Sequence, residues 1–476
     1  MKKLSRKLAF ITALAMLSTF TACGGGDGQE TQSVENGSEP TATSETTTAT
    51  MASEDAEVVE QVEMDAEKLE NGKLRWLSFW SLEPEEGESV DVFLQLFKTK
   101  YGGEIEWIQT TTETKYDDLA TLVLGGDSPD MFPAADLDTF PGKAAAGMFQ
   151  PIDDYIDYST ANFPDGAKAI NEMHTIGGKH YMACVAADAG TIMIYNKNTI
   201  EENGLDDPAE LAYNNEWTWT AFKNMCYEFS DRENDRFAID GWWYELAMIM
   251  STGVPVIGME NGVIQNNIMS PELARVEELF LEMHNADVNF PRAEYNWKEH
   301  PERIGEGKTL FYPVGTWQLF EPDISAFGEP GEIMFVPMPR DEEADAWYQA
   351  ASGGLDAYAM CKGAPNPEAF AAFINCKLTA NSDESVEEVN NKQLREDYGW
   401  TDEMVEMYNY ASDLTNANPV VDFYAAVNND VYNLLHNPIK DASYGGTDWY
   451  SARDAINMAA QTLIDETNAK LAELEQ

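Results

Sequence analysis

The chain has 476 residues, a formal net charge of −54 at pH 7 and 43% hydrophobic residues, a composition typical of a globular protein. The excess of acid excludes a nucleic-acid partner, because binding to a phosphate backbone needs a basic surface. It also disfavours peripheral binding to anionic lipid, which attracts clusters of Lys and Arg.

The first 22 residues have the pattern of a secretory signal peptide. A cationic start, residues 1–7, precedes a short apolar run, residues 8–20. A spanning helix needs about 20 apolar residues, whereas a charged start, a short apolar run and small residues before a cleavage site are typical of secretion. With Ala22 before Cys23, the segment resembles a bacterial lipoprotein signal, which implies that Cys23 becomes the lipidated first residue. An ordinary signal peptide with an incidental cysteine is the alternative.

Residues 23–72 are expected to form a disordered tether. They are rich in Gly, Thr, Ser, Glu and Ala and nearly devoid of aromatic residues. Such a composition buries too little apolar surface to offset the entropy of the chain. We therefore expect this segment to link a lipid on Cys23 to the folded body.

The body alternates strand and helix patterns from about residue 73. Residues 73–80 and 104–110 predict strands, residues 89–103 and 116–126 predict helices that end at glycine pairs, and a short strand follows. This alternation predicts an α/β fold with a largely parallel sheet. The body is too long for one ordinary domain and suits two.

Two later helices are predicted from their first residues. Ser270 and Asn366 stand at the N-cap positions, and a proline follows each of them. Both residue types cap helices, and proline is favoured at the first helical position.

No catalytic or metal-binding motif emerges from the body. Nucleotide-binding loops and a hydrolase elbow are absent, and the five histidines are scattered. The loop 231–240 spaces Asp231, Glu233 and Asp235 as a calcium loop does, but its sixth position is Arg236 instead of glycine. A solvated loop is the better interpretation, and no metal or cofactor is expected.

The body also holds four cysteines, none of them in a C-x-x-C pair: Cys184, Cys226, Cys361 and Cys376. Zinc is therefore not expected. We favour free buried thiols over two disulfides, because a body of this size does not need covalent cross-links.

Several stretches, in order, resemble the extracellular solute-binding proteins of bacterial ABC importers, in the sugar-binding family that includes the maltose-binding proteins. They cover nearly the whole body and include "LVLGGDSPDMFPAAD", "AAAGMFQPIDDYI", "GKHYMACVAADAGTIMIYNKNTIEENGL", "EWTWTAFKNMCYEF", "IGEGKTLFYPVGTWQLFE", "GEIMFVPMPR" and "ASGGLDAYAMCKGAPNPEAFAAFI".

The resemblance implies an α/β, two-lobed periplasmic-binding-protein-like fold of type II, with hinge crossings between the lobes. Lobe 1 would comprise residues 73–186 and 336–385, and lobe 2 residues 187–335 and 386–476. Closure of such lobes buries a ligand on both faces and presents a surface that a permease recognises.

The resemblance also implies where ligand contacts lie. Sugars offer apolar faces and polar edges, so aromatic and charged side chains suit them. Positions that match the family's site segments, several of them with neighbours such as Ser81, Trp242 and Tyr450, are Trp80, Glu83, Asp136, Asp188, Trp243, Trp317, Trp449 and Arg453.

Each of these positions also has a structural interpretation. Tryptophans are often core residues, and Asp188 at the first crossing could cap a helix. Glu83 and Asp136 could be solvated, and Arg453 could pair with an acid.

These features together predict a monomeric, non-enzymatic receptor on the extracellular face of the membrane. It would be held by lipid such as palmitate on Cys23 and deliver a carbohydrate, expected to be an oligosaccharide, to ABC permease subunits. A surface-anchored carbohydrate hydrolase and a tethered sensor or adhesion protein on the same fold are the alternatives.

Overall fold

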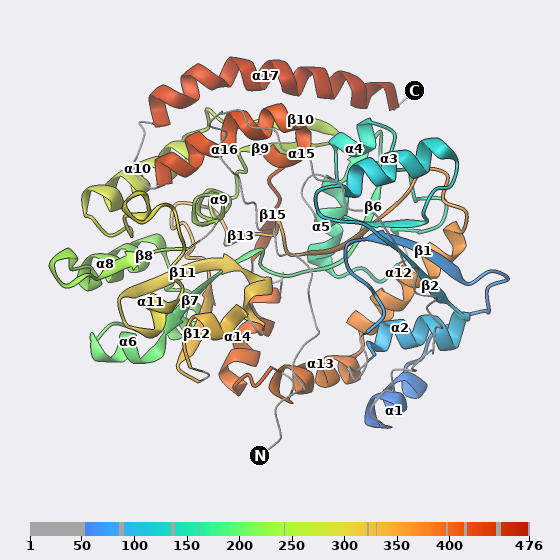
Figure 1. The fold of residues 1–476 in the computed structure, drawn as a ribbon, viewed down its shortest axis with the longest axis horizontal. Helices are drawn as coiled ribbons and strands as arrows, with labels where there is room; N and C mark the ends of the chain where they lie inside the picture. The colour runs from blue at the N-terminus through green and yellow to red at the C-terminus, as the bar shows by residue number, and fades with distance from the viewer. Residues whose placement is uncertain are drawn as a thin grey trace, which may run out of the picture.

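A computed structural model describes residues 53–84, 90–134, 139–159, 161–241, 243–320, 323–329, 331–396, 398–413, 417–443 and 449–474. Within these ranges the chain forms two lobes side by side, each built around its own sheet (Figure 1). The signal segment, Cys23, Asp136 and Trp242 lie outside the described residues.

The first lobe is built on a five-stranded sheet in the order β2-β1-β3-β14-β6. Its strands are β1 (Lys73–Ser78), β2 (Glu104–Gln109), β3 (Met131–Pro133), β6 (Met182–Ala187) and β14 (Leu355–Met360). β1 runs parallel to β2 and β3, while β14 is antiparallel to β3 and β6. Leu74 and Trp76 pack into one hydrophobic cluster and Leu77 into another, so apolar residues of β1 are buried on both faces.

The helices of the first lobe cover its sheet on both faces. α12 packs against α2, β1 and β6, whereas α3 packs on β1 and α5 on β6. The helices of this lobe are α1 (Ser53–Gln61), α2 (Val92–Leu96) with a π-helical turn (Phe97–Tyr101), α3 (Lys115–Gly125), α4 (Gly142–Ala145), α5 (Asp165–Met173), α12 (Pro367–Asn381) and α13 (Glu384–Glu396).

The second lobe is built on a four-stranded sheet in the order β12-β7-β11-β8. Its strands are β7 (Thr191–Asn196), β8 (Phe237–Ile239), β11 (Thr309–Gly315) and β12 (Ile333–Pro337). β7 is antiparallel to β11 and β12, and β11 is parallel to β8. Every residue of β7 and β11 is buried, as expected for central strands covered on both faces.

The second lobe carries most of the helices. They are α6 (Lys197–Glu202), α7 (Pro208–Tyr213), α8 (Trp219–Phe229), α9 (Tyr244–Met250), α10 (Pro271–Asn285), α11 (Glu302–Gly305), α14 (Asp402–Ser412), α15 (Tyr424–Val427), α16 (Asn429–Ser443) and α17 (Trp449–Leu474). Small strand pairs complete the fold: β4 (Thr175–Ile176) with β5 (Lys179–His180), β9 (Ile257–Glu260) with β10 (Val263–Asn266), and β13 (Tyr348–Ala350) with β15 (Asn418–Val420).

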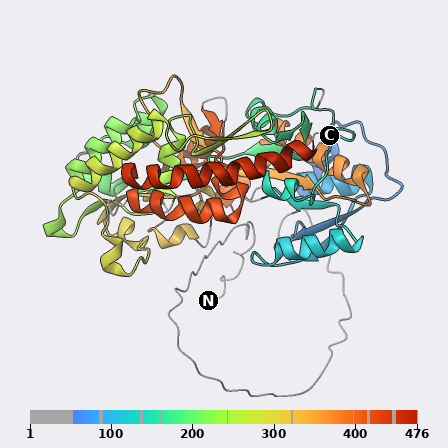
Figure 2. The same cartoon turned by 90° about the horizontal axis from the view of Figure 1, so that it is seen from above.

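The C-terminal helix α17 reaches both lobes. It packs on α16 and β10 of the second lobe and also contacts α4 and β4 of the first. Figures 1 and 2 show it lying along one side of the molecule from one lobe to the other. No helix in the described ranges is both long and apolar enough to cross a membrane.

The predicted strands and helices of the first lobe are confirmed, but the expectation of a largely parallel sheet is wrong, because β14, which comes from much later in the chain, joins antiparallel to β3 and β6 and makes the sheet mixed. The predicted tether also extends too far. α1 lies inside the segment expected to be disordered and packs against α2 and α13. Val59 and Val62 are buried in the first-lobe core. Apolar residues spaced on one face of α1 and just after it outweigh the polar composition of the segment, so the ordered body begins before residue 73.

The two predicted N-caps differ. The Ser270 hydroxyl accepts a hydrogen bond from the Leu273 amide, as expected. The Asn366 side chain makes no capping bond; it donates to the Lys73 carbonyl oxygen at 3.0 Å instead. Asn366 and Pro367 therefore occupy the predicted positions at the start of α12, but the Asn366 side chain ties the helix start to β1 instead of capping it.

The lobes are joined where two chain segments cross in direct backbone contact. The Gly190 amide donates to the Ala350 carbonyl oxygen at 2.6 Å, and the Asp188 amide donates to the Gly354 carbonyl oxygen at 2.8 Å. A Cβ at Gly190 would lie 2.0 Å from the Ser352 carbonyl oxygen, and one at Gly354 would lie 2.5 Å from that of Asp188. Both positions therefore require glycine.

The Asp188 carboxylate at this crossing is held by the second lobe. The Tyr408 hydroxyl on α14 donates to Asp188 Oδ2 at 2.9 Å. Burial raises the pKa of Asp188 above its usual value, while the hydrogen bond from Tyr408 favours the charged form and opposes that rise.

A second junction lies in the segment from β15 to α15. The Asp422 carboxylate accepts from the amides of Val256 at 2.6 Å and Ile257 at 3.2 Å, and its own amide donates to the Ser352 hydroxyl at 2.9 Å. Burial raises the pKa of Asp422 to about 6. The next residue, Phe423, packs its ring against that of His174 of the first lobe. This segment therefore contacts both lobes beside the crossing.

Substitution of Gly190 by alanine should destabilise the protein. The added Cβ meets backbone, which has little room to move, so we expect a loss of about 1–3 kcal/mol or more in the free energy of unfolding. Urea unfolding followed by tryptophan fluorescence measures it. Gly125→Ala is the control, because nothing lies within 4 Å of its Cβ. Equal unfolding midpoints for the two variants would contradict the close contact at the crossing.

The Tyr408→Phe variant should lose stability in a pH-dependent way. A carboxyl whose pKa is raised on folding favours the fold below its unfolded pKa, and this contribution disappears as the pH rises through the folded pKa. Without the Tyr408 hydroxyl the pKa of Asp188 should rise further. The cost should therefore grow from about 1 kcal/mol near pH 4.5 to about 1.5–3 kcal/mol at pH 8, where the hydroxyl donates to a charged group.

The matched control is Tyr410→Phe on the same helix. The Tyr410 hydroxyl donates to the Ala212 carbonyl oxygen at 3.0 Å, a partner that does not titrate. Urea midpoints of both variants between pH 4.5 and pH 8 give the comparison. If the loss of stability in Tyr408→Phe were as independent of pH as the loss in Tyr410→Phe, the assigned role of the Tyr408 hydroxyl would be contradicted.

Candidate ligand-binding site

Trp243 and Trp317 of the second lobe lie against each other. Their ring centroids are 6.2 Å apart and their planes meet at 68°. Trp243 precedes α9 with a φ of 57°, and Trp317 lies in the 3₁₀ turn Thr316–Leu319 after β11. Both side chains are half-buried. The structure thus brings together two predicted site residues from distant parts of the chain and leaves each of them partly exposed.

The position of this pair follows from the crossing between the lobes. β11 ends at Gly315, and the hydroxyl of the next residue, Thr316, donates to the Ala189 carbonyl oxygen. Ala189 lies in the crossing segment between Asp188 and Gly190. The hydrogen bond therefore holds Trp317, one residue further on, beside the junction of the lobes.

Trp80 and Glu83 follow β1 in the first lobe. Trp80 is half-buried and makes edge-to-face contacts with Phe79, at 4.7 Å between centroids, and with Trp76, at 5.3 Å. The Trp76 indole N–H donates to the Trp80 carbonyl oxygen at 3.0 Å, which fixes the turn after the strand. Glu83 forms an ion pair with Lys98, so its carboxylate already has a charged partner.

The predicted site residues near the C-terminus, Trp449 and Arg453, lie on α17. Trp449 begins α17, but its side chain lies outside the described residues, and Tyr450 is exposed. Arg453 is 8% exposed; its Nη1 lies 4.0 Å from Glu277 Oε2 and its guanidinium 4.7 Å from the Tyr450 ring centroid. The Glu277 contact joins α17 to α10, whereas the Tyr450 contact lies within α17, and neither involves the tryptophan pair.

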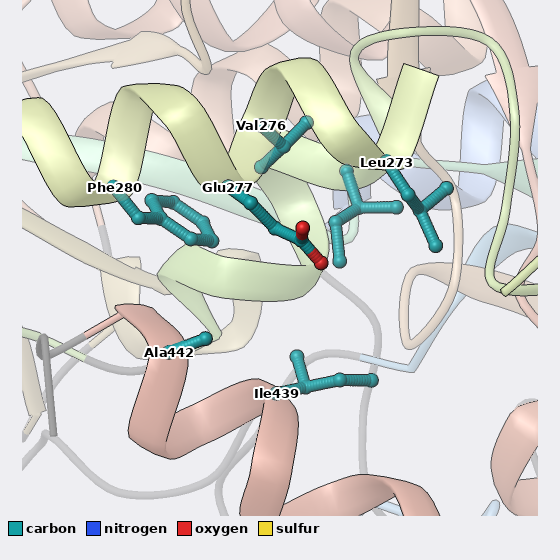
Figure 3. Close-up of a pocket in the computed structure, with 7 residues that line it drawn as sticks. Leu273, Val276, Glu277, Phe280, Ile439 and Ala442 are labelled. Carbon is teal, nitrogen blue, oxygen red and sulfur yellow. The ribbon is translucent and has the colours of Figure 1, made fainter. Parts of the chain in front are cut away.

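A small cavity lies beside this ion pair. The Glu277 side chain points into it between Leu273 and Phe280 of α10, opposite Ile439 and Ala442 of α16 (Figure 3). Its volume of about 10 Å³ is close to the minimum that holds one water. It is far too small for a sugar.

The acidic loop 231–240 is occupied by internal contacts. The Asp231 carboxylate accepts from Asn234, and the Asp235 carboxylate pairs with Arg303, which lowers the pKa of Asp235. Across the described ranges no group of three or more His, Cys, Asp and Glu side chains is arranged to hold a metal.

The cysteines are free and buried, as expected: Cys184, Cys226, Cys361 and Cys376. Burial raises the pKa of each thiol, so none of the four has the character of a reactive thiolate.

Sequence reasoning missed a group of side chains at one edge of the first sheet. Phe79 follows β1, Tyr116 and Lys115 begin α3, and Lys143 lies in α4. The Tyr116 ring packs on Phe132 of β3 at 5.4 Å between centroids. Ligands usually bind at the carboxyl ends of the parallel strands of an open α/β sheet. The position of Phe79 directly after β1 could therefore have indicated this group.

Comparisons with known proteins agree with this architecture. The chain matches the family described as bacterial extracellular solute-binding protein over residues 80–380, more than half of its 476 residues. A search of curated protein sequences finds no significant match.

Many solved structures share the fold. The GacH receptor of Streptomyces glaucescens, solved unliganded and with acarbose, has a TM-score of 0.57 at 15% identity, with 83% of this chain and 98% of that chain covered. The cyclic α-maltosyl-1,6-maltose-binding protein of Arthrobacter globiformis gives 0.60 at 15% identity, covering 83% and 99%. The galacto-N-biose-/lacto-N-biose I-binding protein of Bifidobacterium longum gives 0.56 at 13% identity, covering 86% and 99%.

At such low identities these structures establish the fold alone, and that fold is the expected two-lobed α/β architecture. The family match is independent of them and spans most of both lobes. The chain therefore belongs to the bacterial extracellular solute-binding protein family.

Proposed function

We propose that this protein is a lipid-anchored receptor on the extracellular face of the cell membrane, which binds an oligosaccharide and delivers it to the permease subunits of an ABC importer. The observation that carries the proposal is the half-buried pair Trp243 and Trp317 beside the crossing between the lobes. Aromatic faces match the apolar C–H faces of sugars, and two rings at 68° offer two such surfaces.

The geometry of the lobes supports a binding cycle based on closure. Two rigid lobes joined by a short crossing enclose a ligand by rotation about that crossing. The solved relatives support the ligand class, since they include proteins in complex with acarbose and with lacto-N-biose. We propose that Trp80 contributes a surface from the first lobe, while Asp136, Asp188 and Trp449 stay predicted contacts.

Glu83 and Arg453 are weaker candidates for direct contact, because each already faces an opposite charge in Lys98 and Glu277. We keep them as predicted site residues that a ligand would have to engage alongside those partners.

We propose the predicted lobe boundaries with two adjustments. The second lobe extends to residue 337, because β12 pairs with β7 along its whole length. The first lobe gains residues 53–72, because α1 packs on it. We further propose that the receptor is a monomer and carries out no reaction. A surface carbohydrate hydrolase and a tethered sensor or adhesion protein are the competing proposals.

Removal of the Trp317 ring should weaken ligand binding without unfolding the protein. Thermal shifts of the purified protein against a panel of oligosaccharides identify a ligand, and calorimetry gives the affinity. We expect Trp317→Ala and Trp243→Ala each to lower the affinity about 10-fold or more, since hot-spot aromatic residues contribute 2 kcal/mol or more. The control is Tyr227→Ala, an exposed ring on α8.

Each ligand is also assayed for breakdown products. Product formation would favour the hydrolase, whereas stoichiometric binding without product supports the receptor. Equal affinities for the tryptophan variants and the control would show that the ring pair is not the site.

Substitution of Cys23 should release the protein from the membrane. Each methylene of a buried acyl chain contributes about 0.8 kcal/mol to membrane binding, so the lipidated protein should stay bound. In cells fed labelled palmitate, the parent protein should carry label and sediment with membranes, while Cys23→Ala should lose both properties. Retention of Cys23→Ala in the membrane fraction would contradict lipid anchoring at this residue.

A further inference from the structure

Trp107 of β2 presents an aromatic ring on the surface of the first lobe. The residue is 38% exposed, whereas the predicted contacts Trp80, Trp243 and Trp317 are half-buried. A ligand that covers an exposed ring removes apolar area from water, which favours binding. Trp107 therefore has more surface to offer a ligand than any of these three tryptophans.

The Trp107 side chain is held at the carboxyl end of the neighbouring strand. Its indole N–H donates to the carbonyl oxygen of Ser78, the last residue of β1, at 2.9 Å. The same oxygen accepts the Thr110 amide at 3.1 Å. Because the polar edge of the indole already has a partner in the protein, a ligand would meet an apolar ring surface whose orientation is fixed before binding.

The carboxyl ends of β1 and β2 lie at the end of the sheet where the chain crosses to the second lobe. β14 begins beside the crossing, where Leu355 pairs with Ala187, the last residue of β6. β3 is antiparallel to β14, so it runs toward the crossing. β1 is parallel to β3, and β2 is parallel to β1. The hydrogen bond to Ser78 therefore places the Trp107 indole at the end of the sheet from which the second lobe is reached.

Trp107 and the predicted contact Trp80 both neighbour one buried residue, Trp76. Trp76 is the register partner of Trp107, and register partners on neighbouring parallel strands point to the same face of a sheet. The Trp76 ring also makes an edge-to-face contact with Trp80, at 5.3 Å between centroids. Trp80 and Trp107 therefore lie on the same side of β1 near its carboxyl end.

The loop after β2 adds hydroxyl groups to this region. Thr111 and Thr114 are exposed, and their hydroxyl oxygens lie 3.0 Å apart. The Asp118 carboxylate accepts hydrogen bonds from the hydroxyls of Thr114, at 2.9 Å, and Thr110, which fixes the loop. An aromatic ring beside hydroxyl and carboxylate groups matches the apolar faces and polar edges of a sugar.

Trp107 lies on the opposite side of the first sheet from the crossing. β2 and β6 are the outer strands of the order β2-β1-β3-β14-β6, and neighbouring strands are about 4.8 Å apart, so these two are about 19 Å apart. Trp317 is held beside the crossing segment that follows β6. A ligand that touches both Trp317 and Trp107 therefore has to span several sugar rings.

We infer that the ligand is an oligosaccharide long enough to reach from the tryptophan pair to Trp107, which forms an outer subsite with Trp80 and residues 110–114. The inference rests on the proposed carbohydrate-binding function and adds a subsite and a ligand length to it. Stacking on a ring surface uses the C–H faces of sugars. The outer subsite should therefore add affinity for each chain that is long enough to reach it.

The test compares ligands that differ only in length. Calorimetry on the purified full chain measures malto-, cello- and xylo-oligosaccharides from the disaccharide to the hexasaccharide. In at least one series we expect the affinity to rise about 10-fold or more from the shortest to the longest chain, since a buried aromatic contact contributes that ratio or more.

Variants assign the gain in affinity to Trp107. Trp107→Ala should lower the affinity for the longest chain about 10-fold and lower that for the disaccharide far less, whereas Trp107→Phe keeps an apolar ring and should retain part of the gain. Tyr155→Ala is the matched control, because Tyr155 is an exposed first-lobe ring. It follows Gln150, whose amide donates to the carbonyl oxygen of Met360 at the far end of β14 from the crossing. Thermal unfolding verifies that each variant folds.

The outcomes separate the two proposals. A gain with length that is lost in Trp107→Ala and kept in Tyr155→Ala supports the inference. A gain that Trp107→Ala leaves unchanged, or an equal loss for the disaccharide and the longest chain, overturns the outer subsite. Affinity that does not rise with length in any series overturns the inference and leaves the receptor function standing. Failure of all three series and of the wider oligosaccharide panel to bind overturns both the inference and the proposed function.

Discussion

The crossing of residues 188–190 with residues 350–354 is the constraint on which the two-lobed arrangement depends. Two backbones approach so closely that the Gly190 amide and the Ala350 carbonyl oxygen are 2.6 Å apart, and no side chain fits between the segments. Hydrogen bonds from Thr316 and Tyr408 attach the second lobe to the same few residues. The junction of the lobes and the tryptophan pair are therefore fixed by one set of short contacts, and a shift in the crossing would move Trp317 with it.

The candidate site divides its chemistry between the lobes. The second lobe contributes the half-buried Trp243 and Trp317, and the first lobe contributes the half-buried Trp80. Aromatic residues on both lobes suit a receptor that recognises its ligand only when both lobes engage it.

Much of the fold could be predicted from local patterns, and the reason is physical. Some features depend only on residues that are neighbours in sequence: the alternation in β1 and β2, the glycines after the helices and the cap at Ser270. The sequence alone is therefore enough to predict them. α1 was not predicted, because buried valines stabilise it by packing against other elements, and α1 contacts α2 and α13. Trp243 and Trp317 were predicted to belong to one site, but their direct contact was not predicted. The lysines around Tyr116 were missed. In both cases the residues come from separate elements, and no single stretch of sequence indicates that they meet.

The reach of α17 across both lobes has a mechanical consequence. A helix of 26 residues is stiff, and α17 is packed along α16 and β10 while also touching α4 and β4. Rotation about the crossing cannot leave those contacts unchanged, so α17 acts as a strut that resists wide opening on its side of the molecule. The angular range of the lobes, and with it the free energy difference between open and closed states, therefore depends partly on these contacts of α17. Sequence changes in α17 beyond Arg453 would alter the affinity for a ligand through these contacts.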